Sequence, residues 1–268
     1  MTPIELFDYD INGYVYIEHA VESDYLEQIN NRMDEIEDQV VGERGDMGIK
    51  EDPDVRYDDI INLESNLLPL IDNPVVIPYL REMIEKPRLK STWITFKWRG
   101  GGTGFHSNHT PTTAHNYYHF NGQIRHNLFN VLYAFKDIDP DGGALQIIPG
   151  SHKANYAIPK GENIDHLKIK IPMKAGSVLL FTHDLHHGFL NEGNQVRRTA
   201  IFTCFPGVIA NSFGGDVLYD RLFEEAPGGS WQKYLLRRPN GYKETYPQPE
   251  MSAGQTAMEK ESLLVLQG

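Results

Sequence analysis

The sequence predicts a mainly β protein with N-terminal helices (an α+β arrangement), in which many short strands build a two-sheet β-barrel or jelly roll. Helical periodicity is confined to roughly the first 90 residues. From Arg88 onward, short runs rich in Val, Ile, Thr and aromatic residues alternate with Gly, Pro, Asn and Asp. Such runs predict strands joined by turns, and many of them after a helical section predict two packed sheets buttressed by helices.

The N-terminal part predicts a short helix or turn, a strand over 13–17, and then a long helix. Ser23 and Asp24 are good capping residues, and the apolar residues that follow recur at spacings of three and four, which predicts one buried stripe. These residues are Leu26, Ile29, Met33, Ile36 and Val40. The polar, Gly-containing stretch 42–54 predicts a loop, and Asn73-Pro74 divides the helical pattern of 63–84 into two short helices.

The remaining pattern is that of strands. They are predicted at 91–98, 129–135, 144–148, 167–171, 177–181 and 199–205. Because no linker divides the chain, we expect one domain over 1–268. Its helical support occupies about 1–90, its barrel about 91–210 and a C-terminal extension about 211–268.

The amino-acid composition indicates which classes of binding partner are not expected. The chain has 25 Lys and Arg against 37 Asp and Glu, so its formal net charge is −12. An acidic surface repels nucleic acid and anionic membranes, so neither is expected as a partner. Cys204 is the only cysteine, no signal sequence begins the chain, and no apolar run approaches a membrane span. These features predict a cytoplasmic protein, and they leave its oligomeric state open.

Histidine distribution is the first chemical signal. Of the 11 histidines, all but His19 lie between His106 and His187. Imidazole is a common ligand of iron, copper and zinc, and two histidines with one carboxylate form the facial triad of non-haem Fe(II) oxygenases.

Two segments then carry a resemblance. Residues 142–153 read GGALQIIPGSHK, and they are followed by AGSVLLF at 175–181 and by His186-His187-Gly188. This order resembles the phytanoyl-CoA dioxygenase family of oxygenases over roughly residues 8–207. The resemblance implies a double-stranded β-helix (a jelly-roll, cupin-like barrel). It also implies Fe(II), 2-oxoglutarate as cosubstrate, O2, and hydroxylation of a small molecule.

The resemblance also implies the metal ligands. His106, which follows the Gly-rich turn 100–104, matches the first ligand, and His187 matches the last. His186 is the alternative to His187, and because strand side chains alternate between faces, only one of the two can point into the barrel.

Asn108 stands where the family has its carboxylate ligand, and this departure leaves several interpretations open. Asn108 can ligate through its amide oxygen, or chloride can replace the carboxylate as in iron halogenases. The third ligand can also come from the neighbouring histidines, which are His109, His115 and His119. Two further interpretations remain open. The protein can be a catalytically inactive binding protein, or a cupin-like enzyme that binds its metal through histidines alone.

The distal carboxylate of 2-oxoglutarate would need a buried arginine, whose guanidinium can bind a carboxylate through two hydrogen bonds. In the resembled family this arginine follows the last ligand by about eleven residues. Counting from His187 favours Arg198, whereas counting from Asn191 gives Arg197. The two should point to opposite faces of one strand, and Lys97 is a further candidate for a cosubstrate contact.

Overall fold

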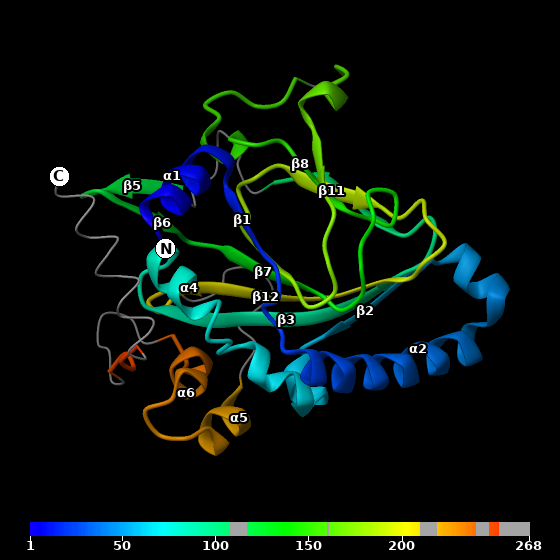
Figure 1. Ribbon diagram of the computed structural model, residues 1–268, viewed down its shortest axis with the longest axis horizontal. Helices are drawn as coiled ribbons and strands as arrows, with labels where there is room; N and C mark the ends of the chain where they lie inside the picture. Colours follow the sequence, from blue (N-terminus) through cyan, green and yellow to red (C-terminus); the bar gives the residue numbers. More distant parts are fainter. Residues whose placement is uncertain (108–116, 160, 210–218, 240–246, 252–268) are drawn as a thin grey trace.

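The computed structural model describes residues 1–107, 117–159, 161–209, 219–239 and 247–251. Two antiparallel sheets dominate it (Figure 1). The larger sheet has the order β1 (Tyr14–Ile17), β10 (Val178–Thr182), β7 (Phe129–Ala134), β12 (Arg197–Pro206), β3 (Pro87–Lys97) and β2 (Asp54–Asp58). The smaller sheet has the order β4 (Gly102–His106), β11 (His187–Leu190), β8 (Leu145–Ile147) and β9 (Ile169–Ile171). A separate hairpin joins β5 (Tyr117–Phe120) to β6 (Gln123–His126).

Helices cover one face of the larger sheet, and the smaller sheet lies over the other face (Figure 1). The α-helices are α1 (Pro3–Asn12), α2 (Ser23–Glu51), α3 (Ile60–Leu63), α4 (Ile77–Met83), α5 (Asp220–Glu225) and α6 (Trp231–Leu236). Short 3-10 turns lie at η1 (Ser65–Leu70), η2 (Ser151–Lys153) and η3 (Asp165–Leu167). The predicted mainly β composition with few helices is therefore confirmed.

The long helix α2 extends further than its sequence indicates. The predicted loop over 42–54 is wrong, because the helix runs to Glu51 and β2 begins at Asp54. Gly45 interrupts the helical geometry with φ 65°, a left-handed backbone that glycine adopts without steric cost. The helix resumes beyond this kink and buries Ile49, which explains why a Gly-containing polar stretch remains helical.

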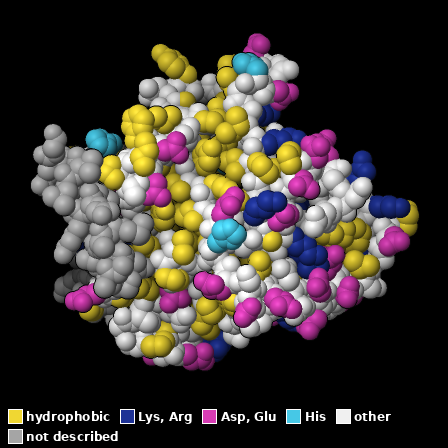
Figure 2. Space-filling view, viewed as in Figure 1, with side chains coloured by type: hydrophobic (Ala, Val, Ile, Leu, Met, Phe, Trp, Pro, Cys, Tyr) yellow, Lys and Arg dark blue, Asp and Glu magenta, His cyan; other side chains and the backbone are white. Residues whose placement is uncertain are grey.

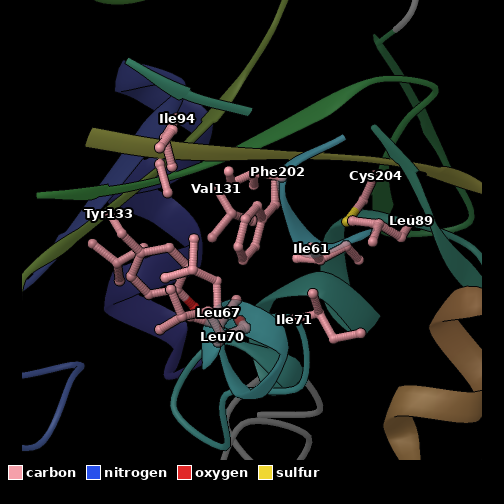
Figure 3. Close-up of a cluster of buried hydrophobic side chains, with 14 of the residues drawn as sticks. Ile61, Leu67, Leu70, Ile71, Leu89, Ile94, Val131, Tyr133, Phe202 and Cys204 are labelled. Atoms are coloured by element: carbon pink, nitrogen blue, oxygen red, sulfur yellow. Dashed lines mark hydrogen bonds between the residues drawn. The ribbon is translucent and has the colours of Figure 1, made fainter. Parts of the chain in front are cut away.

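The main hydrophobic core lies between the larger sheet and the helices. Figure 3 shows Ile61, Leu67 and Leu70 from the helical side packing toward Tyr133 and Phe202 of the sheet. The Tyr133 and Phe202 rings meet edge to face, with centroids 5.7 Å apart. This arrangement uses every second residue of each central strand and leaves the alternate residues to face the smaller sheet.

A second apolar cluster fills the space between the two sheets. It includes Leu132 and Phe181 of the larger sheet with Leu145 and Ile147 of the smaller one. Along β12 the alternation is clear, since Ala200 and Phe202 belong to the helix-side core while Ile201 packs against this second cluster. The inner face of the larger sheet is therefore available for a site.

The surface agrees with the composition. On the face shown in Figure 2, Lys and Arg side chains gather on the right-hand part among Asp and Glu, further Asp and Glu side chains follow the lower edge, and hydrophobic side chains occupy much of the upper left. No helix in the described ranges combines the length and the apolar character that crossing a bilayer requires.

His126, the last residue of β6, forms a buried polar pair with Tyr9, and this pair gives the stability of the protein a testable pH dependence. The Tyr9 hydroxyl lies 2.6 Å from His126 Nε2, and burial, followed by the charges of His152 and Arg125, lowers the pKa of His126 well below its ordinary value. The folded state then binds fewer protons than the unfolded state, so this contribution to stability is complete above about pH 6.5 and declines below it.

We therefore expect the free energy of unfolding to fall by up to about 1.4 kcal/mol per pH unit below pH 6.5 on account of His126. Urea unfolding of the metal-free protein between pH 7.5 and 5 measures this slope. His126→Gln keeps a polar partner for Tyr9 without titrating, so its slope should be shallower. Equal slopes in the two proteins would contradict the assignment.

Candidate active site

A cavity of about 230 Å³ lies between the inner faces of the two sheets. Its polar wall contains three histidines together with Arg197 and Lys97. The remaining lining side chains come from both sheets and include Arg56, Trp93, Thr95, Thr103, Asn130, Leu132, Leu145, Phe181, Phe189 and Ile201. The site is thus built on strands, whose positions the core behind them fixes.

His106 and His187 face each other across neighbouring strands. They are register partners on β4 and β11, and their ring centroids are 4.3 Å apart. The Nδ1 atom of His106 lies 2.7 Å from the Gly104 carbonyl oxygen, and that of His187 lies 2.6 Å from the Leu185 carbonyl oxygen. A carbonyl oxygen only accepts, so each Nδ1 donates, and in the neutral form of each ring the lone pair then lies on Nε2. Nε2 is therefore the atom through which either ring can bind a metal ion.

Burial keeps His187 uncharged. The side chain is almost fully enclosed, and this desolvation lowers the pKa of His187 to about 3, although the Leu185 carbonyl acts in the opposite direction. The neighbouring rings of His183 and His106 lower it further. A neutral ring at physiological pH is the form that binds a metal.

The glycine after His187 permits the close approach of the two strands. A Cβ at Gly188 would lie 2.8 Å from the Phe105 Cα and 2.9 Å from the Thr103 carbonyl oxygen. Both neighbours are backbone atoms of β4, which cannot move without displacing His106. The His-Gly pair is therefore a packing requirement of the site.

Gly188→Ala should separate β4 from β11 and weaken metal binding by roughly 10- to 100-fold, as displaced ligands commonly do. Gly104→Ala is the matched control, because a Cβ there meets no atom within 4 Å. Calorimetric titration with Mn(II) measures both variants. An unchanged affinity in Gly188→Ala would show that the strand spacing does not set the ligand geometry.

His186 points away from the cavity. Its ring stacks on Phe105 with a 6.2 Å centroid separation, and its backbone N–H donates to Ser151 Oγ at 2.9 Å. Ser151 belongs to the Pro-Gly-Ser-His motif, so this motif fixes the start of the strand that carries His187. The expectation that the two adjacent histidines face opposite ways agrees with these contacts.

Most of the candidates for the third ligand lie outside the described residues. Asn108 lies outside them, as do His109 and His115. His119 lies on the β5–β6 hairpin with an exposed side chain and does not line the cavity. Within the described ranges, no three His, Cys, Asp or Glu side chains form a complete metal-binding group.

Arg197 occupies the cavity as a buried cation. Its Nε donates to the Gly143 carbonyl oxygen at 2.8 Å and its Nη1 donates to Thr199 Oγ1 at 2.9 Å. Its Nη2 is buried and has no hydrogen-bond partner among the described residues. Burial lowers the pKa of Arg197 to about 9, so the side chain still carries its charge at pH 7. An unmatched donor on a buried charge is a ready site for an anion.

The glycine motif explains how Arg197 is held. Gly143 has φ 89°, and a Cβ on it would lie 2.7 Å from Arg197 Cδ. Any other residue would be strained there and would also displace the arginine. The Gly142-Gly143 pair therefore supplies both a carbonyl acceptor and the space through which Arg197 passes.

Arg198 points to the other face of β12. It donates to Glu37 of α2 at 2.7 Å and forms an ion pair with Asp34 at 2.6 Å. Strand alternation therefore sends Arg197 into the cavity and Arg198 toward α2, and of the two predicted candidates for a cosubstrate contact only Arg197 lines the cavity.

Lys97 lies directly opposite Arg197 in the register of β3 and β12. It lines the cavity and forms an ion pair with Asp54 at 3.1 Å. Its charge is thus partly offset, whereas that of Arg197 has no carboxylate partner among the described contacts.

Sequence reasoning did not identify several polar residues of the site. Thr95 and Thr199, whose hydroxyls are 2.9 Å apart, support Arg197, and Asn130 contacts His183 at 3.0 Å. Alternation along β3, β7 and β12 was the available signal, since it places these polar residues on one inner face.

Comparison with known proteins gives the chain its relatives. No curated protein sequence matches it significantly. Among solved structures, HygX from Streptomyces hygroscopicus, with nickel and 2-oxoglutarate bound, superposes with a TM-score of 0.66 at 18% identity. That match covers 81% of this chain and 89% of HygX.

Two enzymes of nogalamycin biosynthesis are also similar. The non-haem α-ketoglutarate-dependent epimerase SnoN gives a TM-score of 0.55 at 14% identity, covering 89% of this chain and 94% of SnoN. The carbocyclase SnoK gives 0.57 at 14% identity, covering 91% and 94%. At these identities the likeness concerns the fold. The model of the phytanoyl-CoA dioxygenase family, however, matches residues 9–199, which is well over half of the chain, and the protein therefore belongs to the phytanoyl-CoA dioxygenase (PhyH) family.

Proposed function

We propose that this protein is a non-haem Fe(II)- and 2-oxoglutarate-dependent oxygenase that hydroxylates a small molecule inside a jelly-roll barrel. One observation carries the proposal: the rings of His106 and His187, 4.3 Å apart, line the same cavity as Arg197, whose buried Nη2 has no hydrogen-bond partner among the described residues. Membership of the PhyH family supports it, as do structural neighbours that bind iron or nickel and 2-oxoglutarate.

The residues present fit both groups. His106 and His187 offer neutral nitrogen ligands to Fe(II), with a third ligand from Asn108 or its neighbours. Arg197 offers its free Nη2 to the distal carboxylate of 2-oxoglutarate, and Lys97 lies within the same wall. An acidic or apolar side chain in the place of Arg197 would have excluded this cosubstrate.

When bound, Fe(II), O2 and 2-oxoglutarate supply an oxidant for unactivated C–H bonds, so that R–H becomes R–OH while 2-oxoglutarate becomes succinate and CO2. The chain itself orients the participants. Thr199 and the Gly143 carbonyl fix the guanidinium of Arg197, which would hold the distal carboxylate of the cosubstrate when it binds.

Apolar side chains exclude water from the reaction. Leu132, Phe181 and Ile201 line the inner wall, and Trp93 lies beneath Arg56, whose guanidinium carbon is 4.2 Å from the ring centroid. A cavity of about 230 Å³ accommodates a small substrate or one reacting part of a larger one. SnoN and SnoK are described as an epimerase and a carbocyclase, so proteins of similar fold direct 2-oxoglutarate-dependent chemistry to other outcomes as well, and hydroxylation is the outcome that we propose here.

The test is an anaerobic titration with Fe(II) followed by measurement of succinate release in the presence of O2 and 2-oxoglutarate. We expect uptake of one iron per chain and slow succinate formation without substrate, which a true substrate accelerates. Absence of both iron uptake and 2-oxoglutarate turnover would leave the inactive binding protein as the answer. Added chloride that alters the product would favour the halogenase-like alternative.

A further inference from the structure

Three histidine rings, not two, meet at the proposed metal end of the cavity. The His183 ring centroid lies 5.4 Å from that of His187 and 5.7 Å from that of His106. His183 shortly precedes β11, the strand that begins at His187, and it lines the same cavity. The role of this third imidazole depends on which of its nitrogens carries the hydrogen.

The hydrogen-bond partner of His183 differs in kind from those of the two other rings. His183 Nδ1 lies 3.0 Å from Nδ2 of Asn130, which is an amide nitrogen that only donates. With the Asn130 amide in this orientation, His183 Nδ1 accepts, and the hydrogen of the neutral ring lies on Nε2. His106 and His187, whose Nδ1 atoms face carbonyl oxygens, adopt the opposite tautomer.

A second contact is compatible with this orientation of the Asn130 amide. The Thr203 hydroxyl donates to Asn130 Oδ1 at 3.2 Å, and these two residues are register partners on β12 and β7. Both are buried, so the contact is shielded from exchange with water. Thr203, Asn130 and His183 thus form a chain of two hydrogen bonds. The Nε2–H of His183, at the end of this chain, is the donor that the ring can offer to the cavity it lines.

We propose that His183 is a positioning residue whose Nε2–H donates a hydrogen bond to an anionic oxygen of the ligand held beside His106 and His187. The inference rests on the proposed function and deepens it. The bound carboxylate end of 2-oxoglutarate is the oxygen ligand of the right chemistry. A fixed donor would select one orientation of that ligand, whereas a third free lone pair would compete with it for the metal.

The first arm of the test measures the tautomers directly in the metal-free protein. Long-range 1H–15N correlation spectra of 15N-histidine-labelled protein should show the Nε2–H form for His183 and the Nδ1–H form for His106 and His187. In Asn130→Asp the carboxylate accepts from Nδ1, so His183 should change to the Nδ1–H form. A wild-type His183 protonated on Nδ1 would overturn the proposal.

The second arm measures 2-oxoglutarate binding to the Mn(II)-loaded protein, which does not depend on turnover. His183→Leu should weaken 2-oxoglutarate binding by roughly 10- to 100-fold, the usual effect of residues that support a metal site, while Mn(II) affinity changes much less. Retained Mn(II) affinity also shows that the variant folds. Asn130→Asp should weaken 2-oxoglutarate binding as well, and His186→Gln, on the other face, should leave it unchanged.

These measurements distinguish a failure of the proposed function from a failure of the role of His183. A wild-type protein that binds neither Mn(II) nor 2-oxoglutarate would overturn the proposed function and this inference with it. A wild-type protein that binds both, together with a His183→Leu variant that binds 2-oxoglutarate equally well, would overturn the role of His183 alone.

Discussion

Replacing Arg197 by Ala should weaken 2-oxoglutarate binding by about 2 to 5 kcal/mol, which corresponds to a loss of roughly 30-fold or more. The reason is that Nη2 of Arg197 is the buried cationic donor without a partner among the described residues of the cavity. Removing it leaves the distal carboxylate of the cosubstrate without a counter-charge. Arg197→Lys should recover only part of the affinity, because an ammonium lacks the planar fork.

Arg198→Ala is the matched control, since it is the next residue along the same strand and carries the same charge. Its guanidinium contacts Glu37 and Asp34 of α2, so the variant should lose stability and keep its 2-oxoglutarate affinity. Calorimetric titration of the Mn(II)-loaded proteins with 2-oxoglutarate measures both. Equal losses in the two variants, or a loss confined to Arg198→Ala, would contradict the assignment of Arg197.

Replacing His187 by Ala should abolish stable metal binding and with it all 2-oxoglutarate turnover. We expect the Fe(II) affinity to fall by more than about 100-fold, because a direct ligand contributes more than the residues that orient it. The ring centroids of His187 and His106 are 4.3 Å apart, and the Nδ1 atom of each contacts a carbonyl oxygen. His183, the third described histidine that lines the cavity, has an amide nitrogen there instead.

The neighbouring residue again provides the control for His187. His186→Ala removes an imidazole that stacks on Phe105 outside the cavity, and it should leave iron affinity within a few-fold of the wild type. Anaerobic Fe(II) titration and succinate release measure the effect on binding and on turnover separately. Retention of one tightly bound iron by His187→Ala would show that the metal lies elsewhere.

The sequence predicted every strand of the larger sheet except β2, and in the smaller sheet it predicted β8 and β9 but not β4 and β11. The runs at 129–135, 177–181 and 199–205 correspond to β7, β10 and β12, which are buried on both faces and read as continuous apolar stretches. By contrast, β4 is Gly-rich and largely exposed, and β11 consists of His-Gly-Phe-Leu. Their pairing depends on a contact between Gly188 and β4 that no local pattern records.

The site was predicted in outline through its motifs. His106 and His187 were identified as candidate ligands and lie together, although their role as ligands stays a prediction. The assignment between Arg197 and Arg198 needed the register of β12, because adjacent residues on a strand differ only in the face they occupy. Strand alternation could have placed Asn130 on the inner face of the larger sheet, but not its contacts to His183 and Thr203, which are distant in the chain.

The most direct measurement is a crystal structure of the protein loaded anaerobically with Fe(II) and 2-oxoglutarate, with anomalous data at the iron edge. The account predicts a single anomalous peak within bonding distance of Nε2 of both His106 and His187. It also predicts that the distal carboxylate of 2-oxoglutarate lies on Arg197. An anomalous peak that contacts only one of these rings, or a cosubstrate bound away from Arg197, would contradict it.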